Sequence, residues 1–149
     1  MTKRYLEDFA VGQTFASGKI RLDEAQVKSF AAEFDPQPFH LGEEGARGTL
    51  FGSLAASGWH TAAITMRLMV ESEFRPEGGI VGAGCELAWT RPVRPGDELR
   101  VEVEVLELRP SKSRPGQGML KVRTTTFNQK DEPVQLITSN LVVPRRPAR

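Results

Sequence analysis

The sequence has little cysteine and no long apolar run, and both shortages narrow the classes of protein to which it can belong. A single cysteine, Cys85, among 149 residues excludes an internal disulfide framework and a zinc site built from several cysteines. A lone thiol is consistent with a reducing compartment. No apolar run approaches membrane-spanning length, and the charged start of the chain lacks the apolar core of a secretory signal. We therefore expect a cytoplasmic protein that does not interact with a membrane.

An excess of charge of one sign is also missing. The chain carries 20 basic and 19 acidic residues, a formal net charge of +1, and has no basic block of the kind that marks a nucleic-acid binder. It contains no glycine-rich phosphate loop, no His-Glu metal helix and no Gly-x-Ser-x-Gly elbow. Nucleic acid is therefore not expected as a partner, and nucleotide hydrolysis, zinc proteolysis and serine-hydrolase chemistry lack their usual signatures.

Length and composition predict one globular domain over residues 1–149. Apolar residues make up 39% of the chain and charged residues 26%, which suits a single core. The sequence shows no internal repeat, low-complexity tract or long linker. The stretch 144–149, rich in proline and arginine, is expected to be a flexible, solvated tail.

The first half of the chain predicts a capped helix followed by a stiff loop. Asp23 is a suitable N-cap, and Gln26 follows as its capping-box partner. Proline after Asp35 ends this helix, and a second proline keeps the next residues extended, so a loop is expected from Asp35 to about Thr49. Helical spacing predicts that one face of the helix is buried, with the residues Val27, Phe30, Ala31 and Phe34.

A second helix is expected from Ser57 to about Phe74. Apolar residues recur on more than one side of this segment, so the helix should be buried over much of its girth, as a central helix around which a sheet wraps. Its expected apolar residues are Trp59, Ala62, Ala63, Ile64, Met66, Leu68, Met69 and Val70. His60, in its first turn, is expected to have a satisfied structural role.

Strand signals surround this helix. Residues 9–22 predict an irregular strand pair, or one strand and a loop, with a turn at Ser17-Gly18. Small residues in the run 80–89 are expected to admit close approach of the central helix, and Cys85 is expected to be a buried small side chain. Three further strands are predicted at 99–105, 120–124 and 134–143, the last two joined by a hairpin turn at 128–132. The pattern predicts an α+β protein, an antiparallel sheet packed on a helix.

Asp35 and His40 are the first candidates for chemistry. The two prolines between them stiffen the bend, so a carboxylate and an imidazole can share one small volume. Such a pair can polarise a water or exchange a proton with a substrate near neutral pH. The alternative is that Asp35 is a turn former and His40 a solvated surface residue. A metal site of His40, His60 and a carboxylate would need three ligands to converge from loose spacing.

The start of the central helix is the second candidate. Glycine at 58 lets a ligand approach the free N–H groups at the positive end of the helix dipole, where an oxyanion can be held. The alternative is that Ser57 is an ordinary N-cap and that Gly58 is needed only for packing.

Taken in chain order, these segments resemble the MaoC-like dehydratase family, which includes the (R)-specific enoyl-CoA hydratases. The resemblance spans roughly residues 5 to 143. It rests on the segments Phe9-Ala10-Val11-Gly12-Gln13-Thr14-Phe15, Phe34-Asp35-Pro36-Gln37-Pro38-Phe39-His40, Phe51-Gly52-Ser53-Leu54-Ala55-Ala56-Ser57-Gly58 and Arg91-Pro92-Val93-Arg94-Pro95-Gly96-Asp97. Asp-x-x-Pro-x-His at the end of the first helix is its most specific part. The family has the hot-dog fold, an antiparallel sheet wrapped around a long central helix.

The resemblance implies a hydratase or dehydratase that interconverts a trans-2-enoyl thioester and a 3-hydroxyacyl thioester. In the family, the aspartate and histidine that match Asp35 and His40 activate the water, and the amide that matches Gly58 stabilises the thioester oxygen. We expect Ser57, Trp59 and Phe39 to contact the substrate. No metal and no cofactor are expected, since the acyl-CoA or acyl carrier thioester is itself the substrate. The expected partner is a second copy of the chain, in a homodimer or higher homo-oligomer.

Two departures keep other functions open. Gln37 stands where the family usually has asparagine, and Ser57 where it often has histidine. An acyl-CoA thioesterase is one alternative, because hot-dog folds also host thioester hydrolysis. A non-catalytic subunit that binds acyl thioesters is the other.

Overall fold

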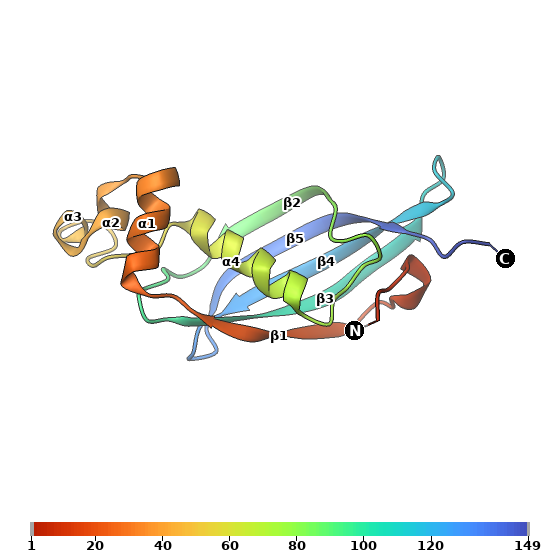
Figure 1. The fold of residues 1–149 in the computed structure, drawn as a ribbon, viewed down its shortest axis with the longest axis horizontal. Coiled ribbons are helices and arrows are strands. Elements are labelled where there is room, and N and C mark those ends of the chain that lie inside the picture. Colours follow the sequence, from red (N-terminus) through yellow and green to blue (C-terminus); the bar gives the residue numbers. More distant parts are fainter. Residues whose placement is uncertain (1, 149) are drawn as a thin grey trace.

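The computed structural model describes residues 2–148. A five-stranded antiparallel sheet, in the order β1-β3-β4-β5-β2, curves around one long helix, and three shorter helices gather at one end of the elongated molecule (Figure 1). The strands are β1 (Thr14–Arg21), β2 (Gly82–Trp89), β3 (Glu98–Pro110), β4 (Gln117–Phe127) and β5 (Pro133–Pro144). The helices are η1 (Leu6–Asp8), α1 (Glu24–Phe34), α2 (Pro38–Leu41), α3 (Glu43–Ala46) and α4 (Gly58–Glu71). The α+β arrangement expected from the sequence is confirmed.

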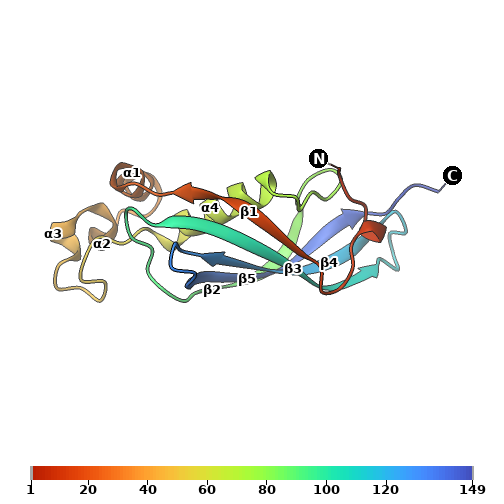
Figure 2. The same cartoon turned by 90° about the horizontal axis from the view of Figure 1, so that it is seen from below.

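The helix α4 packs against the concave side of the sheet, as Figure 2 shows from another direction. Ser57 is its N-cap, and its side chain accepts a hydrogen bond from the Trp59 N–H. Alternation along β3 turns every second residue toward the helix, so that its three valines, Val101, Val103 and Val105, are all buried. The core between the two layers includes Ile64, Leu68, Met69, Val101, Val103, Val105, Leu120, Val122, Leu141 and Val143.

The exposed side of α4 differs from the expectation. Four residues that were expected to be buried are instead exposed along one stripe of the helix: Trp59, Ala63, Met66 and Val70. Hydropathy marks these positions as apolar, but the sheet of one chain covers only part of the girth of the helix. An apolar stripe of this kind needs another surface to cover it.

The segment before α4 confirms the capping prediction and corrects the loop prediction. Asp23 and Gln26 form the reciprocal capping box of α1. The predicted loop after Asp35 contains two helical turns, α2 and α3, because Pro38 at the first position of α2 starts a helix as readily as it extends a chain. Phe34 is 66% exposed and does not belong to the buried face of α1.

Ser17 and Gly18 lie within β1 and do not form a turn. The register of β1 against β3 shifts between Ala16 and Lys19, which makes this dipeptide a β-bulge. The Ser17 hydroxyl accepts a hydrogen bond of 2.8 Å from the Val101 N–H, so a side chain takes the place of the missing backbone partner. The strand therefore continues across residues that usually mark a turn.

The strand β2 is at the edge of the sheet and is exposed along nearly its whole length. Cys85 is exposed, and a Cβ atom on Gly82 or Gly84 would meet nothing within 4 Å. The predictions of a buried thiol and of close approach by the central helix are therefore wrong. Small side chains here leave one edge of the sheet open, and no element in the described part of the chain pairs with that edge.

The helix η1 and the segment after β5 meet at the end of the molecule opposite α1 (Figure 1). Arg145 contacts Glu7 at 3.1 Å, and Arg146 pairs with Asp8, so ion pairs fasten the start of the predicted tail to η1. Residue 149 lies outside the described residues. Within residues 2–148, no helix has the length and apolar character needed to span a membrane.

Candidate active site

Asp35 is held by two side-chain donors at the end of α1. The Ser57 hydroxyl donates to Oδ2 at 2.7 Å, and the Gln37 amide donates to Oδ1 at 2.5 Å. Burial favours the neutral carboxyl, but these two hydrogen bonds and the nearby His40 imidazole outweigh it and hold the pKa of Asp35 below its ordinary value. The carboxylate is therefore ionised at neutral pH.

His40 lies on α2 and is buried. Its Nδ1 is 2.6 Å from the carbonyl oxygen of Ala55, and since a carbonyl only accepts, Nδ1 carries the proton. Its Nε2 faces Asp35 Oδ2 at 3.4 Å. The Ala55 N–H donates to Phe39 O at 3.1 Å, which fixes α2 against the segment that leads into α4. When the ring carries only the Nδ1 proton, Nε2 has a free lone pair. Nε2 and Asp35 Oδ2 are then two hydrogen-bond acceptors that face each other.

Gly58 is the first residue of α4, where a backbone N–H has no partner within the helix. The Ser57 hydroxyl accepts from the Trp59 N–H at 3.2 Å while it donates to Asp35, so one side chain joins the carboxylate to the start of the helix. Glycine is required at 58 by packing, because a Cβ atom there would lie 2.7 Å from Cζ2 of Trp89. The N-cap and packing roles considered from the sequence are both present.

These groups meet in one cavity of about 440 Å³. Asp35, His40 and Gly58 line it, and so do the predicted substrate contacts Phe39 and Trp59. Ser57 does not, because its side chain is fully buried behind Asp35. The lining residues that sequence reasoning missed include Gln37, a donor to the carboxylate, and the aromatic walls Phe51 and Trp89.

Comparison with known proteins assigns the chain to a family. The family model described as MaoC like domain matches residues 8–127, which is more than half of the chain. The chain belongs to the MaoC-like dehydratase family. A MaoC-like dehydratase from Rhodospirillum rubrum has a crystal structure that is 57% identical and superposes with a TM-score of 0.94, covering 97% of this chain and 99% of that one. The architecture is therefore the hot-dog fold.

Two curated relatives of this MaoC-like chain are each 36% identical. One is the uncharacterized protein YdeM of Bacillus subtilis, aligned over 85% of this chain and 89% of its own length. The other is a 3-hydroxybutyryl-CoA dehydratase of Methylorubrum extorquens, aligned over 74% of this chain and 69% of its own length.

The second histidine of the MaoC-like domain lies apart from the cavity. The His60 ring stacks on Phe30 at 4.5 Å with an interplanar angle of 7°, and burial lowers its pKa. Its Nδ1 is buried with no hydrogen-bond partner among the described residues, so the expected satisfied role is wrong in that respect. Residues 2–148 contain no cluster of three histidine, cysteine, aspartate or glutamate side chains placed to hold a metal ion.

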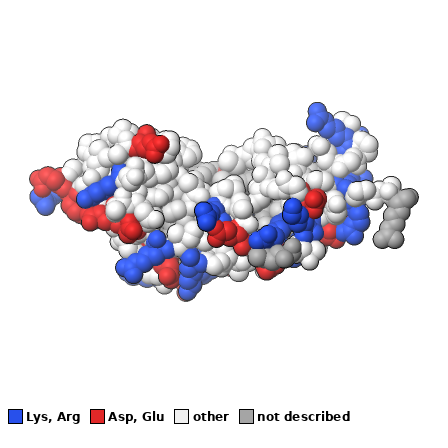
Figure 3. All heavy atoms as spheres, in the orientation of Figure 1, with Lys and Arg blue, Asp and Glu red and all other residues white. Residues whose placement is uncertain are grey.

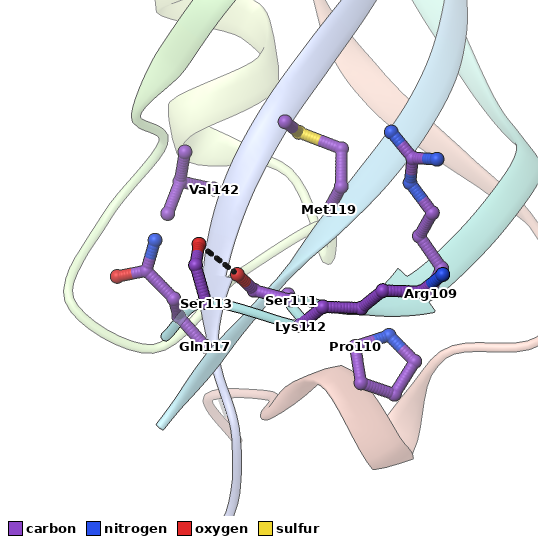
Figure 4. A pocket seen from close by; sticks show the side chains of 9 residues that line it. Arg109, Pro110, Ser111, Lys112, Ser113, Gln117, Met119 and Val142 are labelled. Carbon is purple, nitrogen blue, oxygen red and sulfur yellow. Dashed lines mark hydrogen bonds between the residues drawn. The ribbon is translucent and has the colours of Figure 1, made fainter. Parts of the chain in front are cut away.

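Another cavity, of about 360 Å³, lies beside the β3–β4 hairpin (Figure 4). The hairpin is at the end of the MaoC-like domain opposite α1, α2 and α3 (Figure 1). Arg109, Lys112 and the hydroxyls of Ser111 and Ser113 line this cavity, without a carboxylate or an imidazole. It therefore lacks a pair of groups that can exchange protons near neutral pH.

Proposed function

We propose that this protein is a hydratase/dehydratase that interconverts trans-2-enoyl and 3-hydroxyacyl thioesters. The observation that carries the proposal is the distance of 3.4 Å between Asp35 Oδ2 and His40 Nε2, in a cavity that the first residue of α4 also lines. Membership of the MaoC-like family and the 36% identity to a 3-hydroxybutyryl-CoA dehydratase support it. The thioester needs no cofactor for this reaction.

The facing atoms of the pair are suited to hold a water. With Nδ1 donating to Ala55 O, a neutral His40 presents the lone pair of Nε2. Asp35 presents an ionised Oδ2 whose pKa is kept low. The 3.4 Å between these atoms leaves no room for a water in line, but a water on the cavity side would donate one hydrogen to each. Its oxygen lone pair is then free to attack carbon.

The addition balances with these groups alone. The water oxygen forms a bond to Cβ, its proton passes to the Asp35/His40 pair, and the C=C electron pair moves through Cα to the thioester oxygen. The Gly58 N–H, at the positive end of α4, would stabilise this enolate oxygen. Return of a proton from the pair to Cα completes the 3-hydroxyacyl product, and dehydration is the reverse path.

Ser57 and Gln37 would act through Asp35. Each donates to a different carboxylate oxygen, so together they fix the plane of the carboxylate and favour its charged form. Gln37, which departs from the family pattern, reaches Asp35 with its longer side chain. We assign Ser57 a positioning role in place of the substrate contact expected from the sequence.

The same proposal includes a homodimer. The open edge of β2 and the exposed side chains of α4 adjoin in a largely uncharged area of the surface (Figure 3). The exposed apolar side chains there are Trp59, Met66, Val70, Val81 and Trp89. A second copy that pairs with the β2 edge would satisfy its backbone groups and cover this apolar surface. Sedimentation at micromolar concentration should give a dimer, and a monomer would remove this part of the proposal.

The test follows loss of enoyl absorbance with crotonyl-CoA and longer enoyl-CoA substrates. Asp35→Asn and His40→Gln should each lower kcat by about two to four orders of magnitude. Asp131→Asn, on an exposed turn, and His60→Gln, outside the cavity, are the matched controls and should retain activity. Release of free thiol from a saturated acyl-CoA would indicate thioester hydrolysis instead. Tight binding without turnover, unaffected by loss of His40, would indicate a non-catalytic acyl-binding subunit.

A further inference from the structure

Trp89, the last residue of β2, closes one side of the cavity. Its indole lies on the backbone of Gly58, where a Cβ atom would overlap the ring. Its Nε1 donates to Gly58 O and to Gln135 Oε1, both at 3.0 Å. The ring also meets Trp59 edge-on, with centroids 5.1 Å apart. Trp89 is 45% exposed, yet its contacts with Gly58, Gln135 and Trp59 hold the ring in place.

The space behind Trp89 is filled with polar side chains. Gln135 of β5 is fully buried, and its Nε2 donates to Thr65 Oγ1 at 3.1 Å. Thr65 in turn shares a hydrogen bond of 2.6 Å with Thr126 of β4, and both threonines are buried. A continuous hydrogen-bonded chain therefore runs from Trp89 between α4 and the sheet to β4.

This polar chain opposes entry of an apolar tail. An acyl chain that passed Trp89 would have to separate Gln135 from Thr65 or from the indole, and buried polar groups without partners are costly. The carrier arm of a thioester must leave through the open side of the cavity. The acyl end, on the other side of the reacting double bond, would then extend along the lining of the cavity, of which Trp89 is part.

We propose that Trp89, held by Gln135, limits the substrate to short acyl chains. The inference rests on the proposed hydratase function and adds the substrate class. Trp89 is the residue that sets specificity, and Gln135 positions it.

The experiment compares kcat/KM for crotonyl-CoA and trans-2-octenoyl-CoA. Wild type should prefer crotonyl-CoA, and Trp89→Ala should raise the octenoyl-to-crotonyl ratio at least about tenfold, because even one methylene in an apolar pocket is worth a factor of that order. Trp89→Phe, which keeps a ring but loses the Nε1 donor, should raise the ratio less. Leu87→Ala, on the same exposed strand but outside the cavity, is the matched control and should leave the ratio unchanged.

A binding measurement separates failure of this inference from failure of the proposed function. Calorimetric titration with butyryl-CoA and octanoyl-CoA needs no hydration, because both are saturated. If wild type binds butyryl-CoA more tightly and turns over no enoyl substrate, the chain-length limit stands and the hydratase proposal fails. If wild type binds or turns over the long chain as well as the short one, the inference is overturned, whether or not Trp89→Ala folds. An unchanged ratio in a folded, active Trp89→Ala variant also overturns it.

Discussion

The hydroxyl of Ser57 donates a hydrogen bond of 2.7 Å to Oδ2 of Asp35 and at the same time accepts one from the first turn of α4. A single buried side chain therefore ties the candidate base to the helix end that would stabilise the enolate. The geometry of the site depends on this link between two segments that are separate in sequence.

Replacement of Ser57 by alanine removes both hydrogen bonds. Loss of the N-cap should lower the free energy of unfolding by about 1 kcal/mol. Loss of the donor to Asp35 should raise the pKa of that carboxyl, so the acid limb of the pH profile of kcat/KM moves to higher pH. Ser57→Thr, which keeps the hydroxyl, should restore the profile. A Ser57→Ala variant with lower stability and an unchanged acid limb would show that Ser57 acts only as the N-cap of α4.

Gln37 offers a second test of how Asp35 is held. Gln37→Leu removes the donor at 2.5 Å from Oδ1, so it too should raise the pKa of Asp35 and shift the acid limb of activity upward. Gln117→Leu, at the opposite end of the molecule, is the control for loss of an amide. Identical pH profiles for the two variants would show that Gln37 does not influence the carboxylate.

Residue 58 must be glycine because the Trp89 ring occupies the space of a Cβ atom. Gly58→Ala should destabilise the protein by about 1–3 kcal/mol, the usual range for overpacking. In the Gly58→Ala/Trp89→Ala double variant the new methyl group has room, so the two effects should sum to less than their separate values. If denaturant unfolding gives additive losses of stability in the double variant, contact with Trp89 is not the reason that residue 58 must be glycine.

His60 should make stability depend on pH. Its pKa is lowered by burial in the folded protein, so the unfolded chain binds a proton more readily. The free energy of unfolding is therefore highest above the unfolded pKa of about 6.5 and falls as pH decreases through the lower folded pKa. His60→Phe, which keeps a ring to stack on Phe30, should flatten this decline in urea titrations between neutral and mildly acidic pH. An equally steep decline in the variant would assign it to other groups.

Much of the fold follows from local sequence signals, and the candidate site follows from them in part. Asp23 and Gln26 predict the start of α1 because a capping box is local, and the Asp35–His40 bend is short enough for its two prolines to bring the ends together. The contact of Ser57 with Asp35 joins segments that are distant in sequence, and so do the contacts of Trp89 with Gly58 and Gln135. The spacing of residues along the sequence therefore does not predict these contacts. Cys85 and Phe34 were expected to be buried because a pattern gives apolar periodicity without showing what covers the apolar face.

The central claim is that Asp35 and His40 act on one water as a unit. The most direct measurement is a double-mutant cycle on the hydration of crotonyl-CoA with Asp35→Asn, His40→Gln and the combined variant. Groups that act as a unit lose most of their effect with the first substitution, so the combined variant should be about as slow as the slower single variant. Losses that multiply in the combined variant, or full activity in either single variant, would contradict the account.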